Sequence, residues 1–436
     1  MVYFANQFSM TFLTGCNKIY PVKVTRFWIL YAGVWVCSLY IQEPDLFINI
    51  EGRLVYDVIV VGAGPAGSIL AYLLANRGLQ VLMLEKAALP RYKTCGGGLT
   101  FKAIESLPFD IRSTVEIEAR GGIISYGGKQ LLRTEVRQPF AWLVMRDRFD
   151  HFLVQKAVQA GTHLVDATQV TGIEQGAHQV QARTERGVFY CSLLVGADGV
   201  NSIVASLASL LLQREMGIAL EAEVVVPDAA IKNQGAYATF DFGALPGGYG
   251  WIFPKSDHFS VGLFQARLGK SIGLRAALDQ FIASQPVLRT YQRMNIHGHY
   301  IPLGGRKASL DRGRVILVGD AANLADPWLG EGIYYAILSA KIAAEEITRF
   351  LKGSIPDLSN YTQRINTEIV QQLQQAHRFA RLVYLFPQLG SILISKSSLM
   401  QQMVFDTIRG DQTFQQLNHI LMLRLPRILV QAIRGD

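Results

Sequence analysis

The chain has 436 residues, enough for about three units of ordinary domain size and a large enclosed core. Hydrophobic residues make up 50% of it and charged residues only 17%, which excludes a globally disordered protein, and the length excludes a small disulfide-stapled module. Lys and Arg outnumber Asp and Glu by 42 to 34. The resulting charge of +8 suits an anionic membrane surface, a phosphate-bearing ligand or nucleic acid.

The first 52 residues differ from the rest of the chain. A basic stretch with Lys18, Lys23 and Arg26 precedes an apolar run over residues 27–41. A membrane span needs about 20 apolar residues, and no small-residue cleavage site follows this run. We therefore expect residues 1–52 to be an extension that either seeks a membrane or lies outside the fold, for example because the start site was assigned too early.

A strand, a glycine turn and a helix follow. The apolar run YDVIVV leads into Gly62-x-Gly64-x-x-Gly67 and an apolar helix pattern, and Glu85 ends the next strand, 18 residues after Gly67. This arrangement predicts a dinucleotide site, with a pyrophosphate at the helix N-terminus and a ribose on Glu85. The residues expected to contact the dinucleotide here are Gly62, Gly64, Pro65, Ala66, Gly67, Glu85 and Lys86.

The remaining chain divides by its hydrophobic periodicity. Mixed strands and helices continue to about residue 212, alternating runs then predict an antiparallel sheet, and the chain from Ile333 onward is almost entirely helical in pattern. The predicted fold class is α/β, with a Rossmann-type domain of the glutathione-reductase-like kind that carries a single dinucleotide fingerprint. The expected units are an extension (1–52), a discontinuous cofactor domain (53–215 and 300–350), an antiparallel-sheet substrate domain (216–299) and a C-terminal helical region (351–436).

Two further motifs specify the cofactor. GADGVNS at 196–202 and RVILVGDAANLADPWLGEGI at 314–333 resemble, together with the glycine turn, the flavoprotein family that includes aromatic hydroxylases. The resemblance implies FAD, with Asp320 on the ribityl chain, Asp198 at the junction of the cofactor and substrate domains, and Arg146 near the flavin. The further cofactor residues expected from these segments are Gly97, Gly98, Arg146, Asp198, Gly319, Asp320, Gly330 and Gly332.

A narrower resemblance comes from PRYKTCGGGL (90–99), PGGYGWIFPKSDHFSVGL (246–263) and the GEG turn. Over roughly residues 55–350 the chain is similar to the geranylgeranyl reductase family of FAD-dependent oxidoreductases. It departs from the usual flavoprotein pattern at Ala205, Asn323 and Leu329, where arginine, glycine and threonine are common. The resemblance implies a reductase that passes a hydride from reduced FAD to double bonds of a prenyl chain, and the exact substrate stays open.

Residue types at two places agree with a prenyl substrate. Tyr249, Trp251 and Phe253 alternate on a strand, so their rings share one face, and with Pro254 they are expected to form an apolar wall along the chain of the substrate. Cys95 stands beside three glycines that leave the flavin face open. We expect Cys95, or water held near it, to provide the proton for the second alkene carbon.

Other activities remain open at this stage. One is an FAD-dependent monooxygenase that acts on an apolar substrate, and another is a non-catalytic FAD-containing protein that binds isoprenoids. No second GxGxxG motif follows a strand, so a separate NAD(P)H domain is not expected. The electron donor is therefore expected to dock transiently, either as NADPH or as reduced ferredoxin.

The C-terminal helices suggest where the protein works. Between 371 and 436 seven Lys or Arg face three acidic residues, a balance of +4, and Arg424, Arg427 and Arg434 share one helical face that Pro426 is expected to interrupt. Such a helix suits an anionic bilayer, so we expect a cytoplasmic protein peripheral to a membrane. The basic residues form no recognised nucleic-acid module, and nucleic acid is not an expected partner.

The cysteines and histidines predict no metal. The cysteines form neither a CxxC pair nor a disulfide framework, which favours a reducing compartment; they are Cys16, Cys37, Cys95 and Cys191. No Cys and His residues have zinc spacing, since His297 and His299 stand alone and are expected to point to opposite sides of a strand. No structural or catalytic metal is expected.

Overall fold

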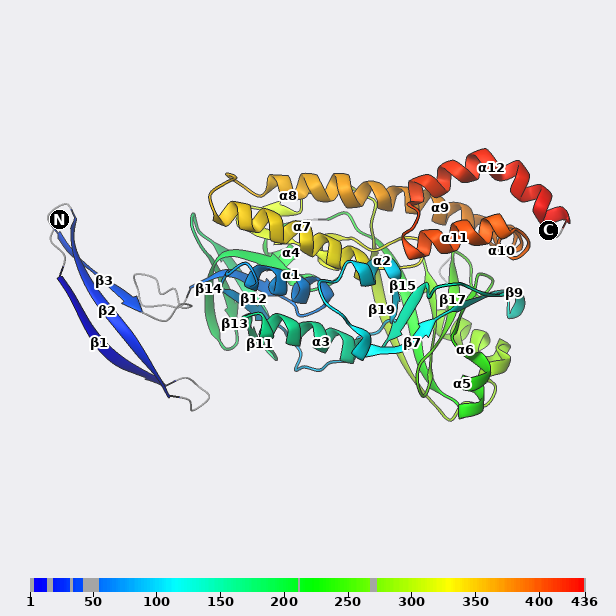
Figure 1. Ribbon diagram of the computed structural model, residues 1–436, viewed down its shortest axis with the longest axis horizontal. Coiled ribbons are helices and arrows are strands. Elements are labelled where there is room, and N and C mark those ends of the chain that lie inside the picture. The colour runs from blue at the N-terminus through cyan, green and yellow to red at the C-terminus, as the bar shows by residue number, and fades with distance from the viewer. Residues whose placement is uncertain are drawn as a thin grey trace.

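The computed structural model describes residues 4–13, 19–31, 34–41, 55–210, 212–266 and 273–434. Its first strands, β1 (Phe4–Leu13), β2 (Ile19–Tyr31) and β3 (Val34–Ile41), pair with one another in an antiparallel sheet of their own (Figure 1). The apolar run is thus divided between β2 and β3 and is not helical. Residues 42–52 lie outside the described residues, so the nature of the whole extension stays a prediction.

The glycine motif and Asp320 follow strands of one mixed sheet, whose strand order is β11-β5-β4-β14-β13-β12 and whose central strands are parallel. β14 pairs with β4 along its length, and its last residues also pair in parallel with β21, which carries β20 on its other edge. The bounds are β4 (Val55–Val61), β5 (Val81–Leu84), β11 (His163–Val165), β12 (Val170–Gln175), β13 (Val180–Thr184), β14 (Gly187–Gly196), β20 (Asp311–Arg312) and β21 (Val315–Leu317).

Helices cover this sheet, which explains why its central strands are continuous apolar runs. Val58, Ile59 and Val60 of β4 are fully buried. α1 (Pro65–Ala75) packs against both α3 (Arg146–Gln159) and α7 (Ile333–Leu351), so the first and the last parts of the cofactor domain meet at one helix.

The second sheet has the order β19-β15-β18-β17-β16-β8-β9 and is antiparallel except for the parallel pair β16–β8. The expected alternating runs supply β15 (Glu215–Val225), β16 (Tyr237–Asp241), β17 (Gly248–Pro254) and β18 (Phe259–Gln265), and β19 (Arg293–Leu303) completes that side. The hairpin of β8 (Gly121–Tyr126) and β9 (Lys129–Glu135) comes from a segment that the predicted boundaries assign to the cofactor domain. Gly127 and Gly128, both with positive φ, allow its tight turn.

Short elements link the two sheets. β6 (Gly98–Thr100), β10 (Ala141–Val144) and β7 (Val115–Ala119) form a small antiparallel sheet between them. The connecting helices and turns are α2 (Phe101–Glu105), η1 (Arg112–Thr114), α4 (Ile203–Leu207), α5 (Asp228–Gln234), α6 (Leu274–Ser284), η2 (Pro286–Leu288) and η3 (Gly319–Ala322).

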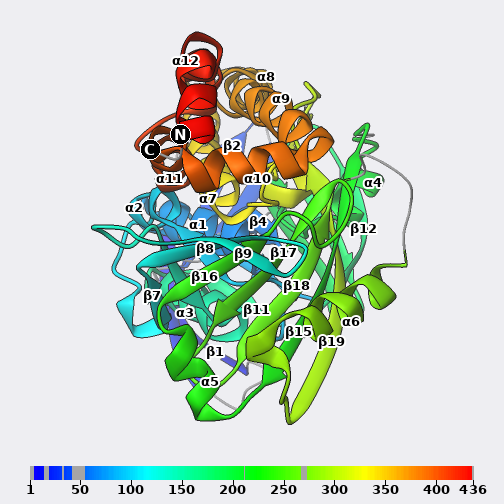
Figure 2. The ribbon, with the colours of Figure 1, turned by 90° about the vertical axis from the view of Figure 1, so that its right-hand side faces the viewer.

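The C-terminal region is helical, as predicted. It contains α8 (Ser359–Arg364), a π-helical turn (Ile365–Val370), α9 (Gln371–Leu385), α10 (Pro387–Lys396), α11 (Ser398–Arg409) and α12 (Phe414–Arg434). α9, α10 and α12 pack together, and α10 lies beside β8 and β9 (Figure 2). The expected interruption at Pro426 is wrong: the backbone of α12 continues through it. Within the described ranges, no helix combines the length and apolar composition needed to cross a bilayer.

Candidate functional site

A cavity of about 570 Å³ lies where the two sheets meet the start of α7. Its walls come from the loop after β4, the segment 91–98, the aromatic residues of β17 and the segment 329–333, and Ile408 of α11 closes part of it. All of the predicted site residues line this cavity except Gly67, Gly319 and Pro254. Residues from the three cofactor motifs and from the expected substrate wall are therefore brought together.

The glycine turn holds the backbone close to the cavity. Gly62 has φ +106°, and a Cβ there would lie 2.4 Å from the carbonyl oxygen of Ala197. A Cβ on Gly67 would lie 1.9 Å from the oxygen of Gly62, so Gly67 acts through close packing of the turn and not by lining the cavity. α1 begins at Pro65, directly at the cavity. The helix N-terminus thus offers backbone N–H groups and partial positive charge to an anion.

Glu85 is buried at the end of β5 beside this turn. Its Oε2 accepts a hydrogen bond from the Ala63 N–H at 2.8 Å, and its Oε1 accepts one from the Ala87 N–H at 3.1 Å. The carboxylate keeps further lone pairs that can accept ribose hydroxyls. Arg91, which the sequence analysis did not single out, lies 3.6 Å from Glu85 and 3.3 Å from Asp150, and it also lines the cavity.

Arg146 is a buried cation at the start of α3. Its guanidinium donates to both oxygens of Asp150, at 2.7 and 2.9 Å. Burial opposes its charge, but Asp150 and Cys95 outweigh burial, so the pKa of Arg146 is raised. Arg148, two residues further along α3, is by contrast exposed to solvent and pairs with Glu116.

Asp198 joins the middle motif to the start of α4. Its Oδ1 accepts from Ser202 Oγ at 2.5 Å and its Oδ2 from the N–H of Ile203 at 2.7 Å. Burial raises the pKa of this carboxyl, although these hydrogen bonds lower it. The residue fixes the loop 196–202 along one side of the cavity, and its predicted role at the domain junction stays a prediction.

Asp320 lies in η3, directly after β21, and is buried. Burial raises its pKa, while the charges of Lys93 and Arg146 act in the opposite direction. A Cβ on Gly332 would lie 3.0 Å from Asp320 Oδ1, so a larger residue there would press on this carboxylate. Gly319 lies outside the lining and donates its N–H to Ser339 Oγ at 3.0 Å, which holds the turn. Asn323, at a position where glycine is common, adopts φ +64°.

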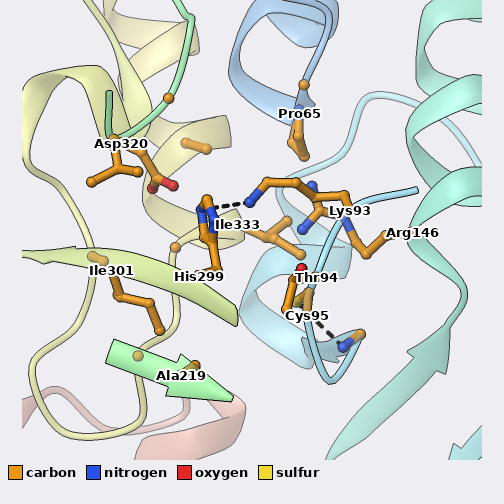
Figure 3. Close-up of a pocket in the computed structure, with 18 of the residues that line it drawn as sticks. Pro65, Lys93, Thr94, Cys95, Arg146, Ala219, His299, Ile301, Asp320 and Ile333 are labelled. Carbon is orange, nitrogen blue, oxygen red and sulfur yellow. Dashed lines mark hydrogen bonds between the residues drawn. The ribbon is translucent and has the colours of Figure 1, made fainter. Parts of the chain in front are cut away.

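Lys93 and His299 face each other across the cavity (Figure 3), with Nζ and Nε2 2.6 Å apart. Burial lowers the pKa of Lys93 to about 8. Burial and the charge of Lys93 lower the pKa of His299 to about 4, so at neutral pH a neutral imidazole accepts from an ammonium. The expectation that His297 and His299 point to opposite sides is wrong, because residues two apart on a strand share a face. His297 packs on the ring of Tyr92, next to Lys93 in the chain, with centroids 4.3 Å apart.

The GEG turn is held by the end of β6 and by α2. The carboxylate of Glu331 forms an ion pair with Lys102 Nζ at 2.7 Å and accepts a hydrogen bond from the hydroxyl of Thr100. Lys102 lies over the rings of Tyr334 and Tyr335. The carboxylate of Glu331 thereby fixes the loop before α7, where Gly330 takes φ +70°.

The expected aromatic wall is present on β17. The rings of Tyr249, Trp251 and Phe253 line the cavity in sequence, with successive centroids 6.3 Å apart. Phe240 on the neighbouring strand adds a fourth ring, 5.4 Å from Phe253. Pro254 is buried at the end of the strand and does not line the cavity.

Cys95 is half-buried in the segment that faces this wall. The N–H of Gly97 donates to its Sγ at 3.3 Å, and Gly97 itself has φ +68°. A Cβ on Gly97 would lie 2.1 Å from the carbonyl oxygen of Val144, so the turn requires glycine there. The thiol is therefore held at the cavity by a sharp loop. Across the described part of the chain, no group of His, Cys, Asp and Glu side chains is arranged to hold a metal ion.

The residues present fit FAD, the cofactor that the sequence resemblance implies. The glycine turn leaves space that a Cβ would fill, a buried carboxylate ends β5, and a second carboxylate and a buried arginine line the same cavity. Sequence reasoning missed Arg91, His299, Glu221 and Lys255. A signal existed for two of them: Glu221 is a carboxylate inside an apolar strand pattern, and Lys255 directly follows the FP pair of the aromatic strand.

Comparison with known proteins supports this cofactor and fold. A family model described as FAD binding domain matches residues 55–258. An uncharacterized protein of Methanosarcina barkeri is 34% identical over 366 residues, covering 83% of this chain and 92% of its own length. Digeranylgeranylglycerophospholipid reductase 2 of Methanopyrus kandleri is 32% identical over 412 residues, covering 86% and 98%. In fold, the chain is similar to a geranylgeranyl bacteriochlorophyll reductase-like protein of Thermoplasma acidophilum, with a TM-score of 0.69, 22% identity and coverage of 88% and 99%.

Proposed function

The chain belongs to the geranylgeranyl reductase family of FAD-dependent oxidoreductases, and from that premise we propose that it saturates carbon–carbon double bonds of a prenyl chain. The observation that carries the proposal is the shared cavity, in which the aromatic wall of β17 faces the Cys95 loop (residues 91–98) and adjoins the cofactor residues. The name of the Methanopyrus relative favours a prenyl chain on a glycerophospholipid as the substrate class.

The walls of the cavity suit a substrate with few polar groups. A prenyl chain offers almost nothing to hydrogen-bond, so its position must be fixed by shape and by contact with apolar surfaces. Tyr249, Trp251, Phe253 and Phe240 supply such surfaces. The Tyr249 hydroxyl does not compete for the substrate, because it donates to the carbonyl of Leu329 at 2.7 Å.

The chemistry that reduced FAD supplies when bound is donation of a hydride to one alkene carbon. The other carbon needs a proton, and Cys95 Sγ is the group that we assign to hold it. The thiol proton goes to carbon and leaves a thiolate beside the Arg146 guanidinium, whose own charge Cys95 helps to stabilise. A proton from bulk solvent then restores the thiol, so each turnover consumes one hydride and one solvent proton and leaves the residues unchanged.

Reduced cofactor has to be regenerated after each double bond. We assign this step either to NADPH, which would deliver a hydride, or to two molecules of reduced ferredoxin, which would deliver one electron each while solvent supplies the proton. The chain has one dinucleotide fingerprint, at Gly62–Gly67, so the donor docks only for the transfer.

An exposed apolar surface on the C-terminal helices supports work at a membrane. We call it the α9–α10 patch; its residues are 36% to 59% exposed, and they are Leu382, Leu385, Phe386, Leu389 and Ile392. The exposed cations Arg378, Arg381 and Lys396 flank it, and no Asp or Glu occurs between 369 and 405. Apolar side chains bordered by cations suit the surface of an anionic bilayer, which is where a prenyl lipid is found.

The decisive experiment is anaerobic. The chemically reduced enzyme is incubated with a geranylgeranylated phospholipid and, separately, with geranylgeranyl diphosphate, and the product mass is measured. Gains of about 2 Da per double bond are expected. No gain without oxygen, followed by about 16 Da once oxygen and NADPH are admitted, would overturn the proposal in favour of a monooxygenase.

A further inference from the structure

Glu221 is a buried carboxylate on β15 that faces the Cys95 loop. It is only 2% exposed. Its Oε2 accepts from the backbone N–H of Cys95 at 2.7 Å and from the Tyr92 hydroxyl at 3.3 Å. A buried charge is costly unless its hydrogen bonds are satisfied, so the loop and the carboxylate stabilise each other.

The other oxygen of Glu221 reaches the aromatic wall. Ser260 Oγ donates to Oε1 at 2.6 Å, and the same Ser260 Oγ accepts from Trp251 Nε1 at 3.1 Å. The Trp251 ring is thus tied through one hydroxyl to the carboxylate that holds the Cys95 backbone. A chain of directed hydrogen bonds of this kind restricts both ends at once.

Lys255 holds the next residue of the loop. Lys255 is 1% exposed, and its ammonium group donates to the carbonyls of Gly96 at 2.9 Å and Val144 at 2.8 Å. Burial lowers the pKa of Lys255 to about 8, and the negative charge of Glu221 acts in the opposite direction. The loop is therefore held by an anion at Cys95 and by a cation at Gly96.

The loop and the wall are in contact at Gly96. A Cβ on this residue would lie 3.0 Å from Trp251 Nε1 and 3.1 Å from the Phe253 ring. A small shift of the loop would therefore change its distance from both rings. Since a prenyl chain has to pass between wall and thiol, that spacing decides which alkene carbon lies near Cys95.

We propose that Glu221 is a positioning residue, which fixes the Cys95 thiol relative to the Trp251 ring and thereby sets where along the prenyl chain protonation occurs. The inference rests on the proposed function for its kinetic part. It assigns Glu221 no direct contact with substrate. The carboxylate acts through the Cys95 backbone on one side and through Ser260 on the other.

Three variants separate the bond of Glu221 to the Cys95 backbone from its link through Ser260 to Trp251. Glu221→Gln cannot accept at both Cys95 and Ser260 as the carboxylate does, so kcat for prenyl reduction should fall about tenfold to a hundredfold and KM should rise. Ser260→Ala releases Trp251 and removes one donor from Glu221, but the Cys95 N–H stays bound to the other carboxylate oxygen. KM should therefore rise severalfold, while kcat falls much less than in Glu221→Gln. Glu215→Gln, at the start of the same strand and away from the lining of the cavity, is the matched control and should leave both constants unchanged.

A second readout does not depend on the substrate. The rate at which iodoacetamide alkylates Cys95 is followed by peptide mass spectrometry in the flavin-loaded protein, with Cys95→Ala as the blank. Glu221→Gln should raise the rate severalfold, because the loop loses its anchor, and Glu215→Gln should not. Two results would overturn the inference. One is an equal alkylation rate in Glu221→Gln and the wild type, and the other is that kcat and KM change by the same factors in Glu221→Gln and in Ser260→Ala. Should the wild type fail to reduce prenyl chains, the proposed function fails and the alkylation result still decides the role of Glu221.

Discussion

Lys93 Nζ and His299 Nε2 lie 2.6 Å apart and join the loop 91–98 to the strand β19 across the cavity. Burial and the charge of Lys93 lower the pKa of His299, because both side chains would be cationic below it, whereas burial and the charge of Arg146 lower the pKa of Lys93. This contact makes a measurable contribution to how stability depends on pH.

The pKa of His299 is lowered to about 4, from an ordinary value near 6.5. Between these values the unfolded chain binds a proton that the folded chain does not, so stability rises with pH from 4 to 6.5 and is lost as pH falls. His299→Gln should remove about 1–2 kcal/mol of this change, allowing for solvent at a partly exposed ring. Urea unfolding of both proteins at pH 4.5 and 7 measures it. If the free energy of unfolding changes equally in both proteins between these pH values, the pKa of His299 is not perturbed.

Gly67→Ala should abolish FAD binding. The added methyl group would lie 1.9 Å from a backbone oxygen of Gly62, which cannot move without opening the turn at the start of α1. The flavin absorbance of the purified protein reports the loss. The matched control is Gly390→Ala, where a Cβ meets nothing within 4 Å, and it should retain full flavin content.

Removal of the Cys95 thiol should slow the reaction without releasing the cofactor. Loss of a positioned proton donor typically costs about a hundredfold or more, so kcat of Cys95→Ala should fall by at least that factor. Cys95→Ser, which keeps a donor of similar size, should recover part of the rate. Equal rates for wild type and Cys95→Ala, with flavin content unchanged, would assign the proton to water.

The aromatic wall can be tested at Phe253. Phe253→Ala removes a ring that contacts the cavity and its neighbour Trp251, so KM for a prenyl substrate should rise about tenfold, corresponding to one to two kcal/mol of lost apolar contact. Tyr291→Ala removes an aromatic ring that is 47% exposed and does not line the cavity, and KM should not change. A rise in both variants would point to general destabilisation.

The α9–α10 patch predicts binding to anionic vesicles. Leu385→Ser combined with Phe386→Ser should reduce co-sedimentation with phosphatidylglycerol-rich vesicles at least tenfold, because two of the most exposed apolar residues are lost. Val158→Ser changes an exposed apolar residue on α3 and should bind like the wild type. Binding that is unaffected by the double substitution would remove this surface from consideration.

The sequence predicted the elements that carry strong local patterns. The strand–glycine–helix unit at Gly62–Gly67, the alternating strands of the second sheet and the C-terminal helices each have a period or a turn signal of their own. The position of the hairpin β8–β9 could not be read in this way, because its parallel partner β16 lies more than a hundred residues later. Pairing between such distant strands leaves no local signal.

The site residues that belong to sequence motifs were predicted. Those that are isolated in the sequence and meet only in the folded protein were missed. Arg146 and Asp320 belong to recognisable segments and lie at the cavity as expected. Glu221 lies on β15 and Lys255 directly follows β17, and they matter only because both reach the Cys95 loop. The error at His297 and His299 was one of geometry, since a strand places every second residue on the same face.

The pairing of β14 with β21 has a consequence for the order in which a newly synthesised chain becomes functional. β21 and the aspartate that follows it leave the ribosome after the whole second sheet has been made. A nascent chain that ends before residue 315 already holds the glycine turn and the aromatic wall, but it lacks Asp320 and the start of α7. If Asp320 holds the flavin as predicted, capture of the flavin is expected to be a late event in biosynthesis, and a truncated translation product is expected to accumulate as colourless protein.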